Sequence, residues 1–210
     1  MTDRIVAFGE GALLVELEQR IDPHIAARAQ AIADAWDRLG HGPSIPSYAA
    51  ILLRFDPVAL EPDAAERAAS EIVATTGAPP DLSTGRVIEI PTRYDGADLE
   101  EVARLSGLTP REVVEAHTSR EHLAYFLGYM PGYAYCAGVD PRIVAPRHAS
   151  PRTRVPAGSV AVVDGQTAIY PFASPGGWRL IGRTDLVLFD PAREEPALIR
   201  PGDRLRFVAL

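Results

Sequence analysis

Residues 128–185 are punctuated by eight glycines and seven prolines, which limits what the second half of the chain can form. Short apolar runs lie between the breaks, among them SVAVV, TAIYPF and WRLIG. Such frequent glycine and proline interrupt long helices, whereas short strands joined by tight turns accommodate them. The tail adds two more strand-like runs, LVLFDP and RLRFVAL. The pattern therefore predicts a β-barrel or β-sandwich.

The first part of the chain alternates between strand-like and helix-like segments. RIVAFG and ALLVEL flank a Gly-Glu-Gly turn, and SYAAILLRFDP and RVIEIPTRY are also strand-like. Residues 22–40 and 61–77 have apolar residues at helical spacing, and each segment ends in glycine. Asp22 is the expected N-cap of the first of these helices. This β-β-α-β-α-β order predicts a small α+β sandwich of one sheet and two helices. Two short helices are expected to follow, one at 98–108 with Asp98 as a possible N-cap and one at 109–119 with Thr109 as the N-cap.

A chain of 210 residues is long enough for two such parts. We therefore expect residues 1–95 to form a small α/β N-terminal domain. Residues 96–210 are expected to form a helical connector followed by the β-barrel.

All 21 basic residues are arginines, and the sequence has no lysine. The chain therefore has no lysine for a Schiff base, for a P-loop or for covalent attachment of biotin. The formal net charge of -7 argues against a general nucleic-acid binder, because such proteins carry a basic face.

Three features predict a cytoplasmic protein. Cys136 is the one cysteine, so no internal disulfide is possible, which suits a reducing compartment. The stretch MTDRIVAFGEGALLVELEQ is acidic and lacks the basic and apolar regions of a signal peptide. The longest uncharged run, residues 123–139, contains four tyrosines, three glycines and a central proline, so we expect no membrane span.

The arginines of the second half are unevenly distributed. Residues 128–185 contain six arginines but only three acids, and no acid lies between Asp140 and Asp164. The arginines within that interval are Arg142, Arg147, Arg152 and Arg154. Guanidinium groups match carboxylate or phosphate oxygens two at a time, so the region suits a planar anion. The alternative is that these arginines lie on the surface and pair with acids of the other part of the chain.

The stretch SPGGW offers groups suited to a ligand. Gly176 and Gly177 can bring backbone N–H groups close to a bound molecule, since no Cβ intervenes. Ser174 and Thr184 supply hydroxyl groups, and Trp178 supplies a flat face. A turn between strands, anchored by a core tryptophan, is the alternative.

Other constellations are weak. His117 and His122 are five residues apart and point to different sides of a helix, so we expect no metal pair there. Cys136 lies among apolar residues, where burial would raise its pKa and make it a poor nucleophile. The sequence has no G-x-S-x-G, Walker A or G-x-G-x-x-G motif.

Long segments of the sequence resemble one known family. The most specific are PRTRVPAGSV and SPGGWRLIGRT, supported by FLGYMPGYAY, PSYAAILLRFDP, DLEEVARLSGLTPREVVEAHTS and LFDPAREEPALIRPGDRLRFV. Over nearly the whole chain they are similar to the family of KipI, the 5-oxoprolinase B subunit and allophanate hydrolase subunit 1. The resemblance implies an α+β fold in which a small α/β N-terminal sandwich is followed by a cyclophilin-like β-barrel, in agreement with the pattern.

The resemblance also implies a function. The chain would be a non-autonomous component of an ATP-dependent 5-oxoprolinase, a hydrolase that converts 5-oxo-L-proline, ATP and water to L-glutamate, ADP and phosphate. The implied partners are the 5-oxoprolinase C subunit (KipA-like, or allophanate hydrolase subunit 2) and a LamB/YcsF-type A subunit. The complex would use ATP with Mg, without covalent biotin on this chain. We expect the magnesium ligands and the general base to lie partly on the partner.

Three alternatives stay open at this point. Some members of the family are KipI-like inhibitors of a sensor histidine kinase. Others form the carboxyltransferase part, or allophanate hydrolase subunit 1, in urea degradation. The third alternative is an interaction module whose barrel serves only as a scaffold.

The aromatic segment departs from the family pattern. The family resembles G-F-x-P-G-F-P-Y-L-G-G, whereas residues 128–138 read GYMPGYAYCAG. The loop RYDGADLEE is also shorter than the glycine-rich version of the family. Both differences would reshape a pocket, so they affect the choice of substrate rather than the family.

Together, these patterns predict one cavity in the barrel, shared by the arginines and the glycine turn and open toward a second polypeptide. Transfer of a phosphoryl group requires positive charge around the reacting oxygens. The residues expected to supply it as catalytic residues are Arg152, Arg154 and Arg183. Those expected to bind substrate or ATP are Arg147, Gln166, Tyr170, Ser174, Gly176, Gly177, Trp178 and Thr184. No metal ligand is expected on this chain.

Overall fold

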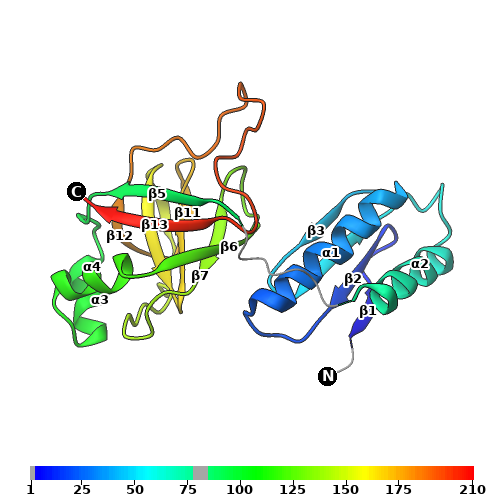
Figure 1. The fold of residues 1–210 in the computed structure, drawn as a ribbon, viewed down its shortest axis with the longest axis horizontal. Helices are drawn as coiled ribbons and strands as arrows, with labels where there is room; N and C mark the ends of the chain where they lie inside the picture. The colour runs from blue at the N-terminus through cyan, green and yellow to red at the C-terminus, as the bar shows by residue number, and fades with distance from the viewer. Residues whose placement is uncertain (1–2, 78–84) are drawn as a thin grey trace. The chain divides into compact units, whose positions relative to one another are not determined.

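The computed structural model describes residues 3–77 and 85–210. The chain divides into two compact units, Met1–Leu82 and Ser83–Leu210 (Figure 1). The first contains a small sheet with helices, and the second a nearly closed barrel. This α+β architecture agrees with the fold class that the sequence predicts. No helix within the described ranges is long and apolar enough to cross a membrane.

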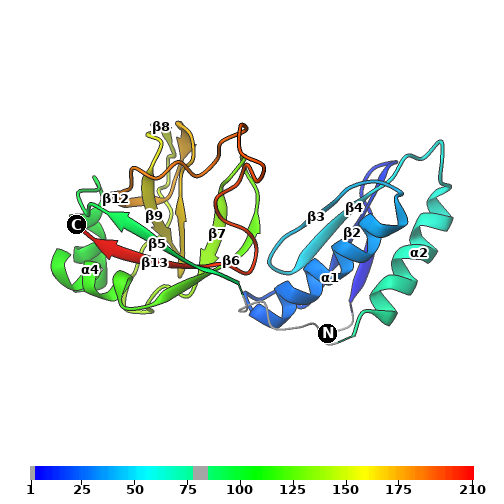
Figure 2. The ribbon, with the colours of Figure 1, turned by 45° about the horizontal axis from the view of Figure 1, so that its top comes forward.

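The first unit is a four-stranded antiparallel sheet with two helices on one face (Figure 2). The sheet order is β1-β2-β4-β3. Its elements are β1 (Arg4–Ala7), β2 (Ala12–Glu16), α1 (Pro23–Leu39), β3 (Ser44–Pro46), β4 (Ala50–Arg54) and α2 (Pro62–Thr75). Helix α1 begins where Asp22 accepts hydrogen bonds from the backbone N–H groups of His24 and Ile25, and it ends at Gly40, whose φ is 72°. Trp36 of α1 is fully buried against the sheet.

The second unit is built around a seven-stranded sheet in the order β12-β9-β10-β7-β6-β13-β5. Its strands are β5 (Val87–Thr92), β6 (Glu121–Leu127), β7 (Ala134–Ala137), β9 (Ser159–Val163), β10 (Gln166–Ile169), β12 (Arg179–Arg183) and β13 (Arg204–Ala209). Arg93 and Arg183 exchange two backbone hydrogen bonds, of 2.9 and 2.8 Å, which join the two edges of the sheet. This bridge makes the sheet a nearly closed barrel.

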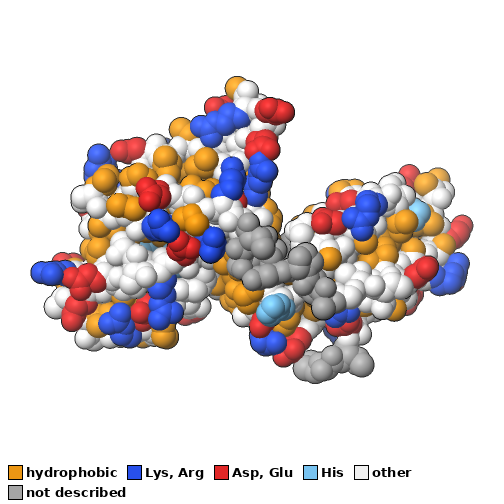
Figure 3. All heavy atoms as spheres, in the orientation of Figure 1, with side chains coloured by type: hydrophobic (Ala, Val, Ile, Leu, Met, Phe, Trp, Pro, Cys, Tyr) orange, Lys and Arg blue, Asp and Glu red, His pale blue; other side chains and the backbone are white. Residues whose placement is uncertain are grey.

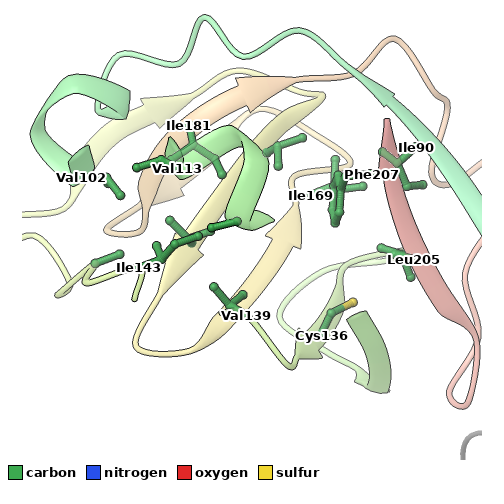
Figure 4. Packing of buried hydrophobic residues seen from close by; sticks show 14 of the residues in the cluster. Ile90, Val102, Val113, Cys136, Val139, Ile143, Ile169, Ile181, Leu205 and Phe207 are labelled. Carbon is green, nitrogen blue, oxygen red and sulfur yellow. The ribbon is translucent and has the colours of Figure 1, made fainter. Parts of the chain in front are cut away.

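Four further elements complete this unit. The short helices α3 (Leu99–Ser106) and α4 (Pro110–Thr118) contribute Val102 and Val113 to the barrel core (Figure 4). The expected cap of α4 is confirmed, because Thr109 and Glu112 form a capping box. β8 (Arg152–Val155) and β11 (Ser174–Gly176) pair with each other as a separate two-stranded sheet.

The boundary between the units differs from the expected division at residues 95 and 96. β5 pairs in parallel with β13 along its whole length, from Val87 beside Arg204 to Thr92 beside Ala209. It is therefore a barrel strand and does not belong to the N-terminal sandwich. The alternating pattern of RVIEIPTRY identifies a strand but does not reveal which sheet it joins, since its partner lies far along the chain.

The barrel core is apolar and tightly enclosed. Ile90, Ile169, Ile181 and Phe207 are at most 1% exposed (Figure 4). Cys136 is fully buried among them, and this burial raises the pKa of its thiol, as the sequence predicts. A buried thiol with a raised pKa supplies little thiolate, so Cys136 contributes to packing.

Candidate functional site

The expected site residues line two cavities, not one. A cavity of about 410 Å³ has walls that include Tyr129, Tyr133, Tyr135, Tyr170 and Trp178, and we call it the aromatic cavity. A second cavity, of about 540 Å³, includes Arg152, Arg154 and Arg183, and we call it the arginine cavity. Both volumes lie in the range of small-molecule sites.

The expectation of a single shared cavity is therefore wrong. The aromatic cavity takes six of the expected ligand residues: Arg147, Gln166, Tyr170, Gly176, Gly177 and Trp178. The arginine cavity takes Arg152, Arg154, Arg183 and Thr184. Ser174 lines neither, and its buried hydroxyl has no hydrogen-bond partner among the described residues. The local structure explains this separation. Side chains two residues apart in a strand project from the same face, so Arg152 and Arg154 of β8 point the same way. Arg147 precedes this strand and is not bound by its alternation.

The walls of the aromatic cavity come from the β6–β7 turn, β7 and the segment before β12. Tyr133 contacts Tyr135 edge-on with ring centroids 5.0 Å apart, and Trp178 lies 6.1 and 5.9 Å from these two rings. Tyr129 contacts the ring of Tyr133 edge-on, and its hydroxyl donates a 2.7 Å hydrogen bond to the Pro175 carbonyl. Edge-to-face packing fixes the orientation of each ring. The cavity therefore presents rigid aromatic faces to a ligand.

The two glycines make room for the polar groups of this cavity. A Cβ on Gly176 would lie 2.4 Å from the Tyr170 hydroxyl, and a Cβ on Gly177 would lie 3.0 Å from Nε of Arg147. Tyr170 and Arg147 can lie against the backbone only because these positions lack a side chain. The role of the glycines that the structure shows is thus to admit two neighbouring side chains.

Arg147 brings a positive charge to the aromatic cavity, whose lining also includes Asp164. It is exposed, and no carboxylate within residues 3–77 and 85–210 forms an ion pair with it. Burial raises the pKa values of Tyr135 and Tyr170, and the positive charge of Arg147 partly offsets that rise. The guanidinium of Arg147 therefore lies close enough to Tyr135 and Tyr170 to influence their ionisation.

Most other arginines of the barrel are neutralised by acids of the same unit. The ion pairs are Arg142–Asp140, Arg152–Asp98, Arg179–Glu101 and Arg183–Asp95. On the face drawn in Figure 3, basic and acidic side chains are likewise interspersed. The sequence left open that these arginines pair with acids. The structure shows such pairs for four of the six arginines between residues 128 and 185. Their partners, however, are acids of this same unit. Arg154 has no ion pair among the described residues.

Asp98 holds two residues that line the arginine cavity, Arg152 and Leu180. Its side chain is buried, with one oxygen 2.6 Å from Nη2 of Arg152 and the other accepting a 2.7 Å bond from the Leu180 N–H. Burial raises the pKa of Asp98, but these hydrogen bonds outweigh it and keep the pKa below its ordinary value. Nε2 of His148 lies 2.7 Å from Nη1 of Arg152. Because arginine only donates, this nitrogen accepts, and the 3.3 Å contact between His148 and Asp98 is not an ion pair.

Removing the Asp98 carboxylate should strongly destabilise the barrel. Asp98→Ala leaves the Leu180 N–H and the Arg152 guanidinium without their partner, and breaking such a buried pair costs about 3–5 kcal/mol. Urea denaturation of the second unit measures the change. Asp95→Ala is the matched control, since the Asp95–Arg183 pair is half-exposed and worth at most about 1 kcal/mol. Equal losses in the two variants would contradict the role given to Asp98.

Sequence reasoning missed several residues that the structure brings to these cavities. Tyr129, Tyr133 and Tyr135 line the aromatic cavity, and Asp98 and His148 bond Arg152 of the arginine cavity. The sequence contained a signal for the tyrosines, because the aromatic segment at 128–138 departs from the family pattern. Asp98 had none, since it was read only as a helix cap. It makes no side-chain capping bond at α3.

Metal ligands are not grouped in the part of the chain that the structure describes. Within residues 3–77 and 85–210, no three side chains of His, Cys, Asp or Glu are arranged to hold a metal ion. His117 and His122 lie side by side with ring centroids 4.8 Å apart, but both are buried in the barrel.

Comparison with known proteins identifies the family. The model of the carboxyltransferase domain, subdomain C and D, matches residues 3–199. The chain belongs to this family. The 5-oxoprolinase B subunit of Escherichia coli O157:H7 is 42% identical over 212 residues, covering 98% of this chain and 95% of that protein. The 5-oxoprolinase B subunit of Bacillus subtilis strain 168 is 48% identical over 128 residues, which cover 60% of this chain and 53% of that protein.

Solved structures of related proteins share the fold. TTHA0988 matches with a TM-score of 0.82 and 37% identity, over 95% of this chain but only 40% of its own. PH0987 from Pyrococcus horikoshii matches with a TM-score of 0.58 and 36% identity, over 99% of this chain and 97% of its own. Kluyveromyces lactis urea carboxylase, at 19% identity and a TM-score of 0.79, shows the fold alone and is covered over 22% of its length. This chain thus spans about half of the B. subtilis relative and less than half of TTHA0988.

Proposed function

We propose that this chain is the B subunit of an ATP-dependent 5-oxoprolinase and acts with a KipA-like C subunit and a LamB/YcsF-type A subunit. The observation that carries the proposal is the E. coli 5-oxoprolinase B subunit, which matches at 42% identity over nearly the full length of both chains. The likeness to urea carboxylase lies at 19% identity and supports only a shared fold. The 5-oxoprolinase assignment is therefore favoured over a role in urea degradation. ATP is a cytoplasmic substrate, so the proposed location is the cytoplasm.

The reaction requires activation of a stable amide. In the proposed sequence, the lactam oxygen attacks the γ-phosphorus of ATP and ADP leaves. Water then adds to the ring carbon, and the ring C–N bond breaks with a proton moving to nitrogen, which leaves the acyl phosphate of glutamate. A second water hydrolyses this acyl phosphate to glutamate and phosphate. The protein must hold the substrate carboxylate, orient the amide and stabilise charge on the phosphoryl group. The proposed complex binds ATP with Mg, and we assign the magnesium ligands to a partner, since the described part of this chain does not group them.

The aromatic cavity is the proposed substrate site. Its volume of about 410 Å³ suits a molecule of this size, and its rings offer faces to a small planar lactam. Arg147 would bind the substrate carboxylate through its guanidinium fork, because no carboxylate of the described chain occupies it. Gln166 and Tyr170 line the same cavity and would hydrogen-bond the amide edge of the ring. Trp178 would stack on the ring, with Gly176 and Gly177 admitting the polar side chains.

The arginine cavity is the proposed site for charge on the phosphoryl group. Arg154 is the guanidinium available for this role, since it has no ion pair among the described residues. Arg152 and Arg183 would join it only by exchanging their bonds to Asp98 and Asp95. Thr184 lines this cavity and would add a hydroxyl donor. Ser174 lines neither cavity, so we assign it no contact with substrate.

Reconstitution tests the proposed function. The chain is purified alone, with the KipA-like partner, and with both the KipA-like and LamB/YcsF-type partners from the same organism. Release of ADP is measured with and without 5-oxoproline. We expect 5-oxoproline-dependent ADP and glutamate only in the complete mixture. A complete mixture that hydrolyses no 5-oxoproline, or one that requires biotin and urea, would overturn the assignment.

A further inference from the structure

One face of the N-terminal sheet carries an apolar row that spans all four strands. Val6 of β1 lies beside Leu14 of β2, Leu14 beside Leu52 of β4, and Leu52 beside Ile45 of β3. Residues paired directly across antiparallel strands project from the same face, so the four side chains form one continuous row. We call Val6, Leu14, Leu52 and Ile45 the apolar row.

The apolar row lies on the face opposite the helices. Leu13 and Leu53, the sequence neighbours of Leu14 and Leu52, belong to the core under α1 and α2. Successive residues of a strand point to opposite faces, so Leu14 and Leu52 point away from that core. Figure 2 shows both helices on the same side of the sheet. No element of the described part of this unit covers the other side.

The exposure of this row is unusual for a sheet face. Ile45 is 51% exposed and Val6 is 37% exposed, while Leu14 and Leu52 are partly exposed. An antiparallel sheet that faces water on one side normally places polar residues there. A connected row of apolar side chains with polar residues beside it is typical of a surface that binds another protein.

The flanks of the row are charged. On one side, Arg4 and Glu16 pair with each other across β1 and β2. On the other side, Arg54 lies opposite Ala12 and has no ion pair with any described residue. A matching surface would therefore have an apolar centre and a carboxylate opposite Arg54.

We propose that the apolar row is the docking surface for the KipA-like partner, and this proposal rests on the proposed function. The matched family model covers only subdomains C and D of a carboxyltransferase domain. TTHA0988 contains a unit like this chain as 40% of a longer polypeptide, so additional chain accompanies this fold in a relative of 37% identity. On the proposed function, a second polypeptide, the KipA-like subunit, supplies the corresponding additional part. The sheet face offers this second polypeptide an apolar surface with Arg54 at its edge.

A charge placed in the row tests the proposal. Ile45→Arg changes a half-exposed side chain, so the fold should persist, which far-UV circular dichroism and thermal unfolding verify. Binding of the purified KipA-like partner from the same organism is measured by calorimetry. We expect the Kd to rise at least about 30-fold for Ile45→Arg and roughly 3-fold to 10-fold for Arg54→Ala. Val58→Arg is the matched control, because Val58 is 94% exposed in the same unit and lies outside the row. Its Kd should not change.

Thiol labelling locates the contact directly. The natural thiol, Cys136, is fully buried, so Ile45→Cys provides a single accessible thiol for a maleimide probe. We expect rapid labelling of the free chain and at least about 10-fold slower labelling after the KipA-like partner binds. Val58→Cys should label at the same rate in both states.

Several outcomes would overturn the docking surface. The docking surface would be rejected if Ile45→Arg bound the KipA-like partner with an unchanged Kd. It would also be rejected if the labelling rate of Ile45→Cys did not change in the complex. Neither result would affect the proposed function. Slow labelling of the free monomeric chain would show that the chain covers this face itself. Slow labelling together with a dimer in sedimentation would assign the face to a second copy. No binding of the KipA-like partner by the wild-type chain would overturn both proposals.

Discussion

Replacement of Arg147 by alanine should lower kcat/KM of the reconstituted complex for 5-oxoproline by about 30-fold to 100-fold. The guanidinium lines the aromatic cavity and forms no ion pair among the described residues, and charge-assisted hydrogen bonds contribute about 1.5–3 kcal/mol. The loss should appear chiefly in KM, because the substrate carboxylate is bound in both the ground state and the transition state. Initial rates of ADP release over a range of 5-oxoproline concentrations measure it.

Two variants control this experiment. Arg147→Lys keeps the charge but removes the planar fork, so it should recover only part of the loss. Arg142→Ala removes an arginine that is already paired with Asp140 outside the aromatic cavity, and it should leave both kinetic constants unchanged. Wild-type kinetics in Arg147→Ala would show that the substrate does not bind through this residue.

Acidification from pH 7 to pH 4.5 should destabilise the barrel by up to about 5 kcal/mol through two buried histidines. His117 and His122 have no exposed surface, and their rings are stacked. Thr167 donates its hydroxyl hydrogen to the Ala161 carbonyl, so it must accept from Nε2 of His117 at 3.0 Å. Nδ1 of His117 then accepts from the Tyr94 hydroxyl at 2.7 Å. The neutral ring satisfies both partners, and a second proton on it has no acceptor in this arrangement.

The sign of the pH effect follows from the pKa values. Burial lowers the pKa of His117 well below its ordinary value, and burial also lowers the pKa of His122. The unfolded chain, with histidine pKa values of about 6.5, therefore binds more protons below that pH than the folded chain does. Stability is complete above pH 6.5 and falls as the pH decreases, by about 1.4 kcal/mol per pH unit for each histidine until its folded pKa is reached.

Urea denaturation between pH 7 and pH 4.5 tests this expectation. The window lies above the ordinary titration of carboxylates, so the lowered pKa of groups such as Asp98 adds little to the slope there. His122→Gln should reduce the slope, because only His117 then titrates. A barrel whose unfolding free energy is flat across this range would contradict the role of the buried pair.

Much of the local structure was readable from the sequence, because its signals are themselves local. Asp22 and Thr109 cap helices as expected, since a capping side chain bonds N–H groups two or three residues away. Glycine and proline punctuation correctly predicted short strands in the barrel. The partner of β5 was not readable, because alternation reports that a strand has two faces but not which distant strand it joins.

The candidate site illustrates the same limit. Arg147 and Arg152 are close in sequence and were expected in one cavity, yet the start of β8 sends them to different ones. Asp98, which neutralises Arg152, comes from a loop 54 residues earlier in the chain. Charge composition thus indicated that anions are bound in this region but not that most of those anions are side chains of the same unit.

The position of β13 between β5 and β6 affects how the protein is made. Residues 204–209 form β13, which pairs with both β5 and β6. The edges of β5 and β6 that bind β13 therefore stay unpaired until almost the whole sequence has left the ribosome. During synthesis the two exposed edges are open to pairing with other nascent chains. Slow translation or a shortage of chaperones should therefore reduce the yield of this barrel more than that of the N-terminal sandwich, whose strands all lie within the first 54 residues.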